Sequence, residues 1–265
     1  MSTIRARGVE LAWSERGAGG PVILIHDTAL DGQAWEQVSA ALAEAGARAI
    51  ALDRRGWGGS SAPEDYRRTT IEEQSEDVAA VAEAAAAAPA VLCGAGIGAV
   101  IALDLLLRRP KLVAGAVLVE PPVLGLVPAA TEALSADQVE LERAVADRGP
   151  DAAVELYLSG RLLGLGPGIE RLPEKLTEPA RERREALLAE LGAATAWGMP
   201  LRRLADATRP SLIVCSATTP PLLREASEAL AERLAGTRRV ELTGGTGPAH
   251  LDDPAAVARL AAGLG

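Results

Sequence analysis

The chain contains few of the residues that build metal centres, disulfides and basic surfaces. Its 265 residues include two cysteines, two histidines and no phenylalanine. Cys93 and Cys215 each lie inside an apolar, strand-like run, which predicts buried thiols rather than a disulfide or a metal site. The net charge is -9 and no basic run offsets it, which argues against nucleic acid and anionic membranes as partners. We therefore expect neither a metal nor another cofactor.

Long apolar runs are also missing from the chain. No stretch of about 20 apolar residues is present, and the first residues lack the apolar core of a signal peptide. These absences predict a cytoplasmic protein that does not enter a membrane and acts on a small-molecule substrate or ligand. The sequence carries no indication of the oligomeric state.

What is present is a regular alternation of short apolar runs with helix-length segments. This pattern is typical of an α/β fold with a mostly parallel sheet and helices on both faces. Eight strands are predicted, near residues 2–6, 9–16, 21–25, 47–52, 89–93, 113–119, 210–215 and 237–242. The predicted helices cover residues 32–45, 71–87, 98–109, 221–235 and 251–262. An alanine run at 84–88 is expected to continue the second helix up to Pro89.

Residues 123–205 interrupt this alternation. The stretch is charged and helical in composition, and it is broken by glycines and a proline at 164–168 and by Pro173 and Pro179. We predict that it is a helical lid inserted into a core domain formed by residues 1–122 and 206–265.

The segment from Ala90 to Ala99 predicts a strand that enters a helix through a tight glycine turn with Gly96 at its tip. Glycine has no side chain that can attack a substrate, so Gly96 itself forms no covalent intermediate. The turn leaves the backbone N–H groups of Ile97, Gly98 and Ala99 at the positive end of a helix dipole. A carboxylate or a phosphate could bind there.

Several motifs, in this order along the chain, resemble those of the α/β-hydrolase superfamily. They are the turn His26-Asp27-Thr28 followed by Trp35, the loop Asp53-Arg54-Arg55-Gly56-Trp57-Gly58-Gly59-Ser60, the glycine turn at 94–98, and the turn Ala249-His250-Leu251. The resemblance spans nearly the whole chain outside the predicted lid. It implies an α/β-hydrolase fold with a mostly parallel eight-stranded sheet, helices on both faces and an inserted helical lid.

The resemblance also implies roles for individual residues. Gly96 occupies the position of the nucleophile, and His250 matches the catalytic histidine. The backbone N–H groups of Thr28 and Ile97 match the donors of an oxyanion hole, while Thr219 falls near the usual position of the catalytic acid.

Two acidic residues are candidates to assist His250. Asp27 replaces the glycine of the family's turn and puts a carboxylate where a substrate oxygen would seek a donor, so it would repel an oxyanion unless it were turned away or protonated. Glu120 directly follows the strand at 113–119, a position from which some family members take the acid, and a His250–Glu120 dyad is one possibility. The residues expected to line the pocket are His26, Trp57, Tyr157 and Thr219.

These residues leave three functions open. Because Gly96 cannot be a nucleophile, the first is non-covalent acid–base chemistry on a small organic molecule by His250, as in a hydrolase-like enzyme, lyase, cyclase or isomerase. The second is a non-catalytic pseudo-hydrolase that binds a small ligand. The third is dinucleotide binding, because residues 94–99 fit a G-x-G-x-x-A fingerprint with Glu120 about 20 residues further on. The strands before residue 90 and the turn at His250 argue against this third function.

Overall fold

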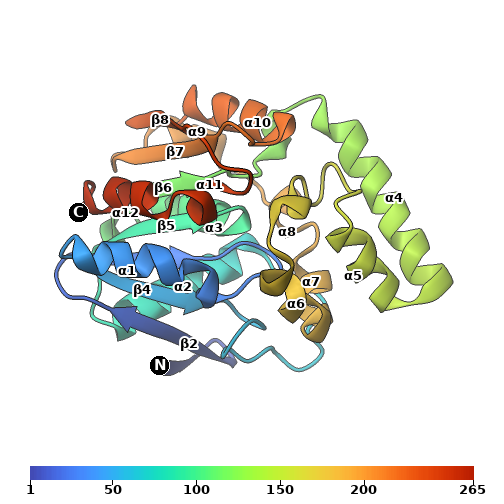
Figure 1. Ribbon diagram of the computed structural model, residues 1–265, viewed down its shortest axis with the longest axis horizontal. Coiled ribbons are helices and arrows are strands. Elements are labelled where there is room, and N and C mark those ends of the chain that lie inside the picture. The colour runs from blue at the N-terminus through green and yellow to red at the C-terminus, as the bar shows by residue number, and fades with distance from the viewer.

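Eight strands form a single sheet in the order β1-β2-β4-β3-β5-β6-β7-β8, and the computed structural model describes residues 1–265. The strand β2 pairs antiparallel with both β1 and β4, and all other neighbours are parallel (Figure 1). The predicted fold class is confirmed, and each predicted strand lies within two residues of its observed bounds. The strands are β1 Ser2–Ala6, β2 Val9–Arg16, β3 Pro21–Ile25, β4 Arg48–Asp53, β5 Ala90–Ala95, β6 Val113–Val119, β7 Ser211–Ser216 and β8 Thr237–Leu242.

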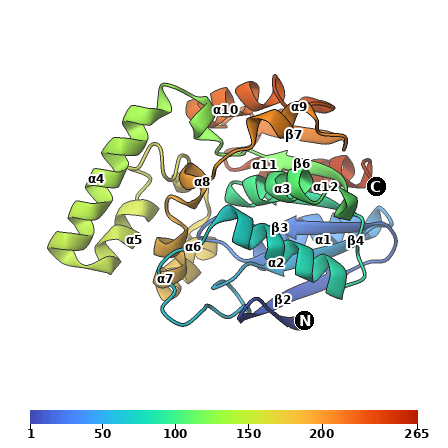
Figure 2. The ribbon, with the colours of Figure 1, turned by 180° about the vertical axis from the view of Figure 1, so that it is seen from behind.

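Helices cover both faces of the sheet (Figures 1 and 2). Residues of α1 and α12 pack in one apolar cluster with one face of the strands, and residues of α2, α3 and α10 pack with the other. Burial of these two clusters provides the main driving force for the fold. The elements outside the insertion are η1 Gly32–Trp35, α1 Glu36–Glu44, α2 Ile71–Ala84, α3 Ile97–Arg108, η2 Pro110–Leu112, α10 Pro221–Ala231, α11 Ala249–Asp252 and α12 Pro254–Ala262.

The sequence patterns at the helix ends have direct counterparts. The Thr70 side chain accepts a hydrogen bond from the Glu73 backbone at 3.1 Å and caps α2. The end of this helix is a correction, because α2 stops at Ala84 and the rest of the alanine run lies outside it. Both cysteines are buried and free, as predicted. None of the helices combines the length and the apolar composition that crossing a membrane requires.

Most residues between β6 and β7 form a group of helices beyond the sheet edge where the parallel strands end (Figure 1), whereas residues 201–205 lie beside β7. Many of their apolar side chains form a separate cluster, in which Tyr157 and Leu187 pack with Trp57 and Tyr66 from the other part of the chain. Trp197, in contrast, packs in the core of the sheet. The lid bounds at residues 123 and 205 stay a prediction. The elements here are η3 Leu124–Leu126, α4 Ala130–Arg148, α5 Pro150–Leu158, η4 Ile169–Arg171, α6 Glu174–Glu182, α7 Arg184–Glu190, α8 Ala193–Ala196 and α9 Leu201–Ala205.

The three central parallel strands bring the candidate residues to one edge. Asp27 follows β3, Gly96 follows β5, and Glu120 follows β6 directly. Because parallel strands end on the same side of a sheet, these three positions meet beneath the helices of the insertion.

Candidate active site

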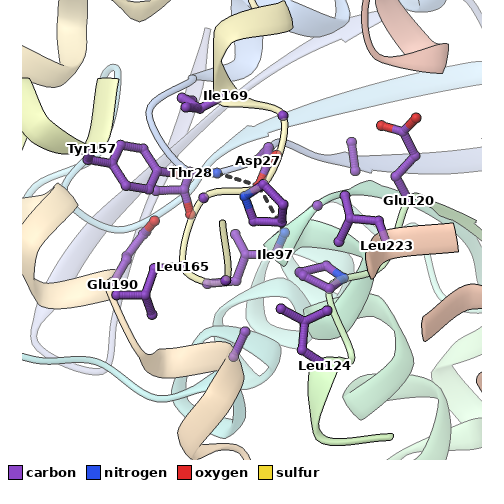
Figure 3. A pocket seen from close by; sticks show the side chains of 18 of the residues that line it. Asp27, Thr28, Ile97, Glu120, Leu124, Tyr157, Leu165, Ile169, Glu190 and Leu223 are labelled. Atoms are coloured by element: carbon purple, nitrogen blue, oxygen red, sulfur yellow. Dashed lines mark hydrogen bonds between the residues drawn. The ribbon is translucent and has the colours of Figure 1, made fainter. Parts of the chain in front are cut away.

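One cavity lies between the sheet edge and the helices that follow β6. Figure 3 shows Asp27, Thr28, Ile97 and Glu120 on its sheet side and Tyr157, Leu165, Ile169 and Glu190 on the side of the insertion. His250 also lines the cavity. No group of three or more histidine, cysteine, aspartate or glutamate side chains is arranged to hold a metal ion.

The Asp27 carboxylate occupies the candidate oxyanion hole. Its Oδ1 accepts hydrogen bonds from the backbone N–H of Thr28 at 2.7 Å and of Ile97 at 2.9 Å (Figure 3). Ile97 is the first residue of α3, so the positive end of that helix dipole faces the carboxylate. The other oxygen, Oδ2, accepts no hydrogen bond from the protein. The two N–H donors that the resemblance assigned to a substrate oxygen are therefore bound to a side chain of the protein.

Gly96 lies in the strained turn between β5 and α3. Its backbone has φ 52° and ψ -124°, a conformation that favours glycine. A Cβ atom added at residue 96 would overlap the Asp27 carboxyl group. The Asp27 side chain therefore fills the space that a nucleophile at residue 96 would need, and the two unusual residues complement each other in volume.

The surroundings of Asp27 disfavour its charged form. Burial raises the pKa of the Asp27 carboxyl group from 3.8 to about 6, while the N–H donors of Ile97 and Thr28 and the positive charge of Arg54 oppose this shift. The negative charge of Glu190 raises the pKa further. The carboxyl group is thus mostly ionised at neutral pH but titrates close to it.

His250 is buried in α11 without a hydrogen-bond partner on either ring nitrogen. Its ring packs against the indole of Trp35, with 4.7 Å between the ring centroids. Burial and the nearby charge of Arg171 lower the pKa of His250 to about 3. The imidazole is therefore neutral at physiological pH.

Glu120 does not form the hydrogen bond to His250 that a dyad requires. Its carboxylate pairs instead with Arg171, with 2.8 Å between Oε2 and Nη2, and Oε1 accepts from Thr219 Oγ1 at 2.6 Å. Glu120 also has a positive φ of 48°, which is uncommon for a residue with a side chain. Asp27 makes no hydrogen bond to His250 either, so neither predicted acid orients the imidazole in this structure.

Three predicted pocket residues and one residue of the predicted anion-binding turn lie outside the cavity lining, which is a correction. They are His26, Trp57, Gly98 and Thr219. His26 instead supports the turn, because its Nδ1 donates to the carbonyl of Asp27 at 2.8 Å while Nε2 accepts from the backbone N–H of Arg54 at 3.0 Å. Trp57 donates from Nε1 to Glu190 at 2.7 Å. Both side chains are too deeply enclosed to reach a ligand.

Tyr157 is the predicted pocket residue that does line the cavity. It comes from α5 in the inserted segment, and only 4% of it is exposed. Burial and the negative charges of Asp27 and Glu190 raise the pKa of Tyr157 well above its ordinary value. Its hydroxyl group therefore keeps its proton over the physiological pH range.

Three charged residues of the site were missed by reasoning from the sequence. Arg54 and Glu190 form a buried ion pair although 136 residues separate them, and Arg171 pairs with Glu120 across 51 residues. Arg54 and Glu190 are each only 2% exposed. The one available signal was the unusual number of charges in the loop at 53–55, which did not reveal their partners.

Comparisons with known proteins agree with this fold. A family model described as the alpha/beta hydrolase family matches residues 22–260. An epoxide hydrolase from Caballeronia sordidicola is 37% identical over 107 residues, which cover 40% of this chain and 32% of that protein. A protein of Mycobacterium tuberculosis H37Rv that is named as a non-heme bromoperoxidase, BpoC, is 38% identical over 112 residues. These residues cover 42% of this chain and 41% of that protein. This chain thus matches less than half the length of these relatives.

Solved structures share the whole fold. An alpha/beta hydrolase from Sphaerobacter thermophilus has a TM-score of 0.74 and 23% identity, and the likeness covers 99% of each chain. The functions predicted from Gly96 need correction, because the relatives are named as enzymes, among them an epoxide hydrolase. Non-covalent chemistry without a nucleophile, a non-catalytic ligand-binding module and a dinucleotide-binding protein were therefore wrong predictions.

Proposed function

Since the chain belongs to the alpha/beta hydrolase family, we propose that it is a hydrolase in which the Asp27 carboxylate is the nucleophile and the substrate is a small epoxide. One observation carries this proposal. Asp27 lines the cavity, its Oδ1 is held by the N–H groups of Thr28 and Ile97, and its Oδ2 accepts no hydrogen bond. One oxygen is thus fixed and the other is available to attack.

The occupied oxyanion hole favours attack on a saturated carbon over attack on an ester carbonyl. A separate nucleophile attacking an ester would need these two N–H donors for the substrate oxygen, and the loss of even one such donor costs about 10²- to 10³-fold in rate. Attack by Asp27 Oδ2 on an epoxide carbon needs no such donor. The product of that attack is an ester of Asp27 itself.

The first step opens the ring. An electron pair of Asp27 Oδ2 forms a bond to an epoxide carbon, the carbon–oxygen bond of the ring breaks, and its electron pair stays on the ring oxygen. Tyr157 gives its proton to that oxygen. This role is supported by the place of Tyr157 in the cavity wall.

The second step releases the diol. Water adds to Cγ of the Asp27 ester and gives one proton to His250, while the developing negative charge on Oδ1 is stabilised by Thr28 and Ile97. The bond from Cγ to the alkyl oxygen then breaks, and that oxygen takes the proton from His250. The second proton of the water passes through the new carboxyl group of Asp27 to the Tyr157 phenolate.

The epoxide assignment has two supports. One is the available proton of Tyr157, which a strained ring oxygen needs as it opens. The other is the similarity to a protein named as an epoxide hydrolase, which extends over 40% of this chain. We also propose that residues 123–205 act as a lid, because they supply Tyr157 and most of the apolar wall of the cavity.

Trapping the ester tests this proposal. The variant His250→Gln is mixed with styrene oxide and quenched in acid, and the intact mass and the peptide masses are measured. We expect a mass increase equal to one epoxide on the peptide that contains Asp27, because ester formation persists while hydrolysis is slowed. The control Asp27→Asn should carry no adduct. An adduct elsewhere, or none while the wild type produces diol, would rule out Asp27 as the nucleophile.

A further inference from the structure

Glu190 connects the inserted helices to the turn that carries Asp27. It is the last residue of α7, and its side chain is completely buried. The carboxylate forms an ion pair with Arg54, in which Nη2 donates to Oε2 at 3.1 Å, and it also accepts from Trp57 Nε1 at 2.7 Å. Figure 3 shows Glu190 on the same side of the cavity as Tyr157.

The guanidinium group of Arg54 makes the second half of this connection. Its Nη2 donates to the carbonyl of Asp27 and its Nε to the carbonyl of His26, both at 3.0 Å. Its Nη1 donates to Gln74 Oε1 of α2 at 2.7 Å. A rigid planar guanidinium therefore holds two successive carbonyls of the turn and is itself oriented by a carboxylate from α7.

We propose that Glu190 is a positioning residue. Through Arg54, it makes the reactivity of Asp27 depend on correct packing of the inserted helices against the core. This inference rests on the proposed nucleophilic role of Asp27. Displacement of α7 would remove the partner of Arg54, which would release the carbonyl of Asp27. Shifts of about 1 Å in a reacting group can cost about 10²-fold in rate.

A neighbouring contact makes it possible to distinguish this positioning role from simple attachment of the inserted helices to the core. Arg183, the residue before α7, donates from Nη2 to the carbonyl of Gly58 at 3.0 Å. This contact also ties the inserted segment to the core, but it is exposed and does not reach Asp27. Replacement of Arg183 is therefore a matched control, because it removes a contact between the inserted segment and the core that does not involve Asp27.

Several charged groups act on Asp27, and their signs determine the expected pH effect. The negative charge of Glu190 raises the pKa of Asp27, and the positive charge of Arg54 lowers it. Removal of the Glu190 charge therefore lowers the pKa of Asp27, both directly and by leaving Arg54 without a counter-charge. The other titratable or charged groups around the turn and cavity are His26, Tyr157, Glu120, Arg171 and His250.

The variants Glu190→Gln and Arg183→Met test the inference. The pKa of Asp27 is measured without substrate by NMR of carboxyl-labelled aspartate, assigned with Asp27→Asn, and kcat and KM for styrene oxide are measured against pH. For Glu190→Gln we expect a pKa lower by about half a pH unit or more, a matching shift of the acidic limb of kcat/KM, and about tenfold lower kcat at an unchanged KM. Arg183→Met should change none of these.

Equal behaviour of the two variants, or an unchanged pKa in Glu190→Gln, would overturn the inference. If Glu190→Gln does not fold, the double variant Arg54→Met/Glu190→Met leaves no buried charge unpaired. It should fold and lose at least as much kcat, whereas wild-type kcat in this variant would refute the role of Glu190. If the ester forms at Asp27 but Glu190→Gln leaves the pKa of Asp27 unchanged, only this inference is wrong. If Glu190→Gln changes the pKa of Asp27 but no ester forms at Asp27, the proposed nucleophilic role of Asp27 is wrong.

Discussion

Replacement of Asp27 by asparagine should stabilise the fold while abolishing activity. Burial raises the pKa of this carboxyl group from 3.8 to about 6, so the folded protein holds the proton more tightly than the unfolded chain does. The stability linked to this proton is fully present below pH 3.8 and is lost as the pH rises through about 6. At pH 7 the ionised carboxylate therefore costs the folded state up to about 3 kcal/mol.

The magnitude can be checked against the contacts. Asparagine has nearly the same size, and its carbonyl oxygen can still accept from Thr28 and Ile97. The variant thus keeps the hydrogen bonds and removes the buried charge. The value of about 3 kcal/mol is an upper limit, because Asp27 is partly exposed to the cavity.

The assay is urea unfolding of the wild type and Asp27→Asn at pH 7 and at pH 4. We expect the variant to be more stable by about 1–3 kcal/mol at pH 7 and the difference to nearly vanish at pH 4. Asp206→Asn, at an exposed position, is the control and should change stability little at either pH. A variant that is less stable at pH 7, or a difference of the same size at both pH values, would refute the reasoning.

Two further predictions concern the same turn. Below pH 6 kcat/KM should fall about tenfold per pH unit as Asp27 takes up a proton, so a flat profile between pH 4.5 and 7 would exclude Asp27 as the ionised nucleophile. The single variant Gly96→Ser should gain no esterase activity, because the serine would collide with the Asp27 carboxyl group. The double variant Asp27→Gly/Gly96→Ser frees both the space and the N–H donors and should hydrolyse p-nitrophenyl acetate. Equal activity of the single and double variants would contradict the proposed clash.

The sequence was sufficient to predict the sheet and the sheet edge at which Asp27, Gly96 and Glu120 lie. The central strands β3 to β7 are short apolar runs whose side chains are mostly buried, so their bounds are visible in composition alone. The end of α2 was missed because alanine favours helix wherever it occurs, while the chain turns at Ala85 to reach β5. Asp27 and Gly96 were each recognised as unusual, but their complementarity in volume depends on a contact across 69 residues that no local pattern records.

The ion pair of Arg54 and Glu190 behind Asp27 could not be predicted from the sequence for a related reason. Arg54 and Glu190 are ordinary charged residues in local terms, and only the folded chain shows that both are buried and paired. The pairing of Glu120 was hidden in the same way, because Arg171 lies close enough to pair with the carboxylate that was one possible partner of His250. Partner choice among charges is set by tertiary packing, which one sequence does not reveal.

The most direct test of the nucleophilic role of Asp27 is a single turnover in ¹⁸O-labelled water with enzyme in excess over styrene oxide. If Asp27 forms the ester, the diol should contain unlabelled oxygen from the carboxylate, and one ¹⁸O atom should appear in the peptide containing Asp27. The peptide containing Asp53 should remain unlabelled and serves as an internal control. Label in the diol, with none in the Asp27 peptide, would contradict the account.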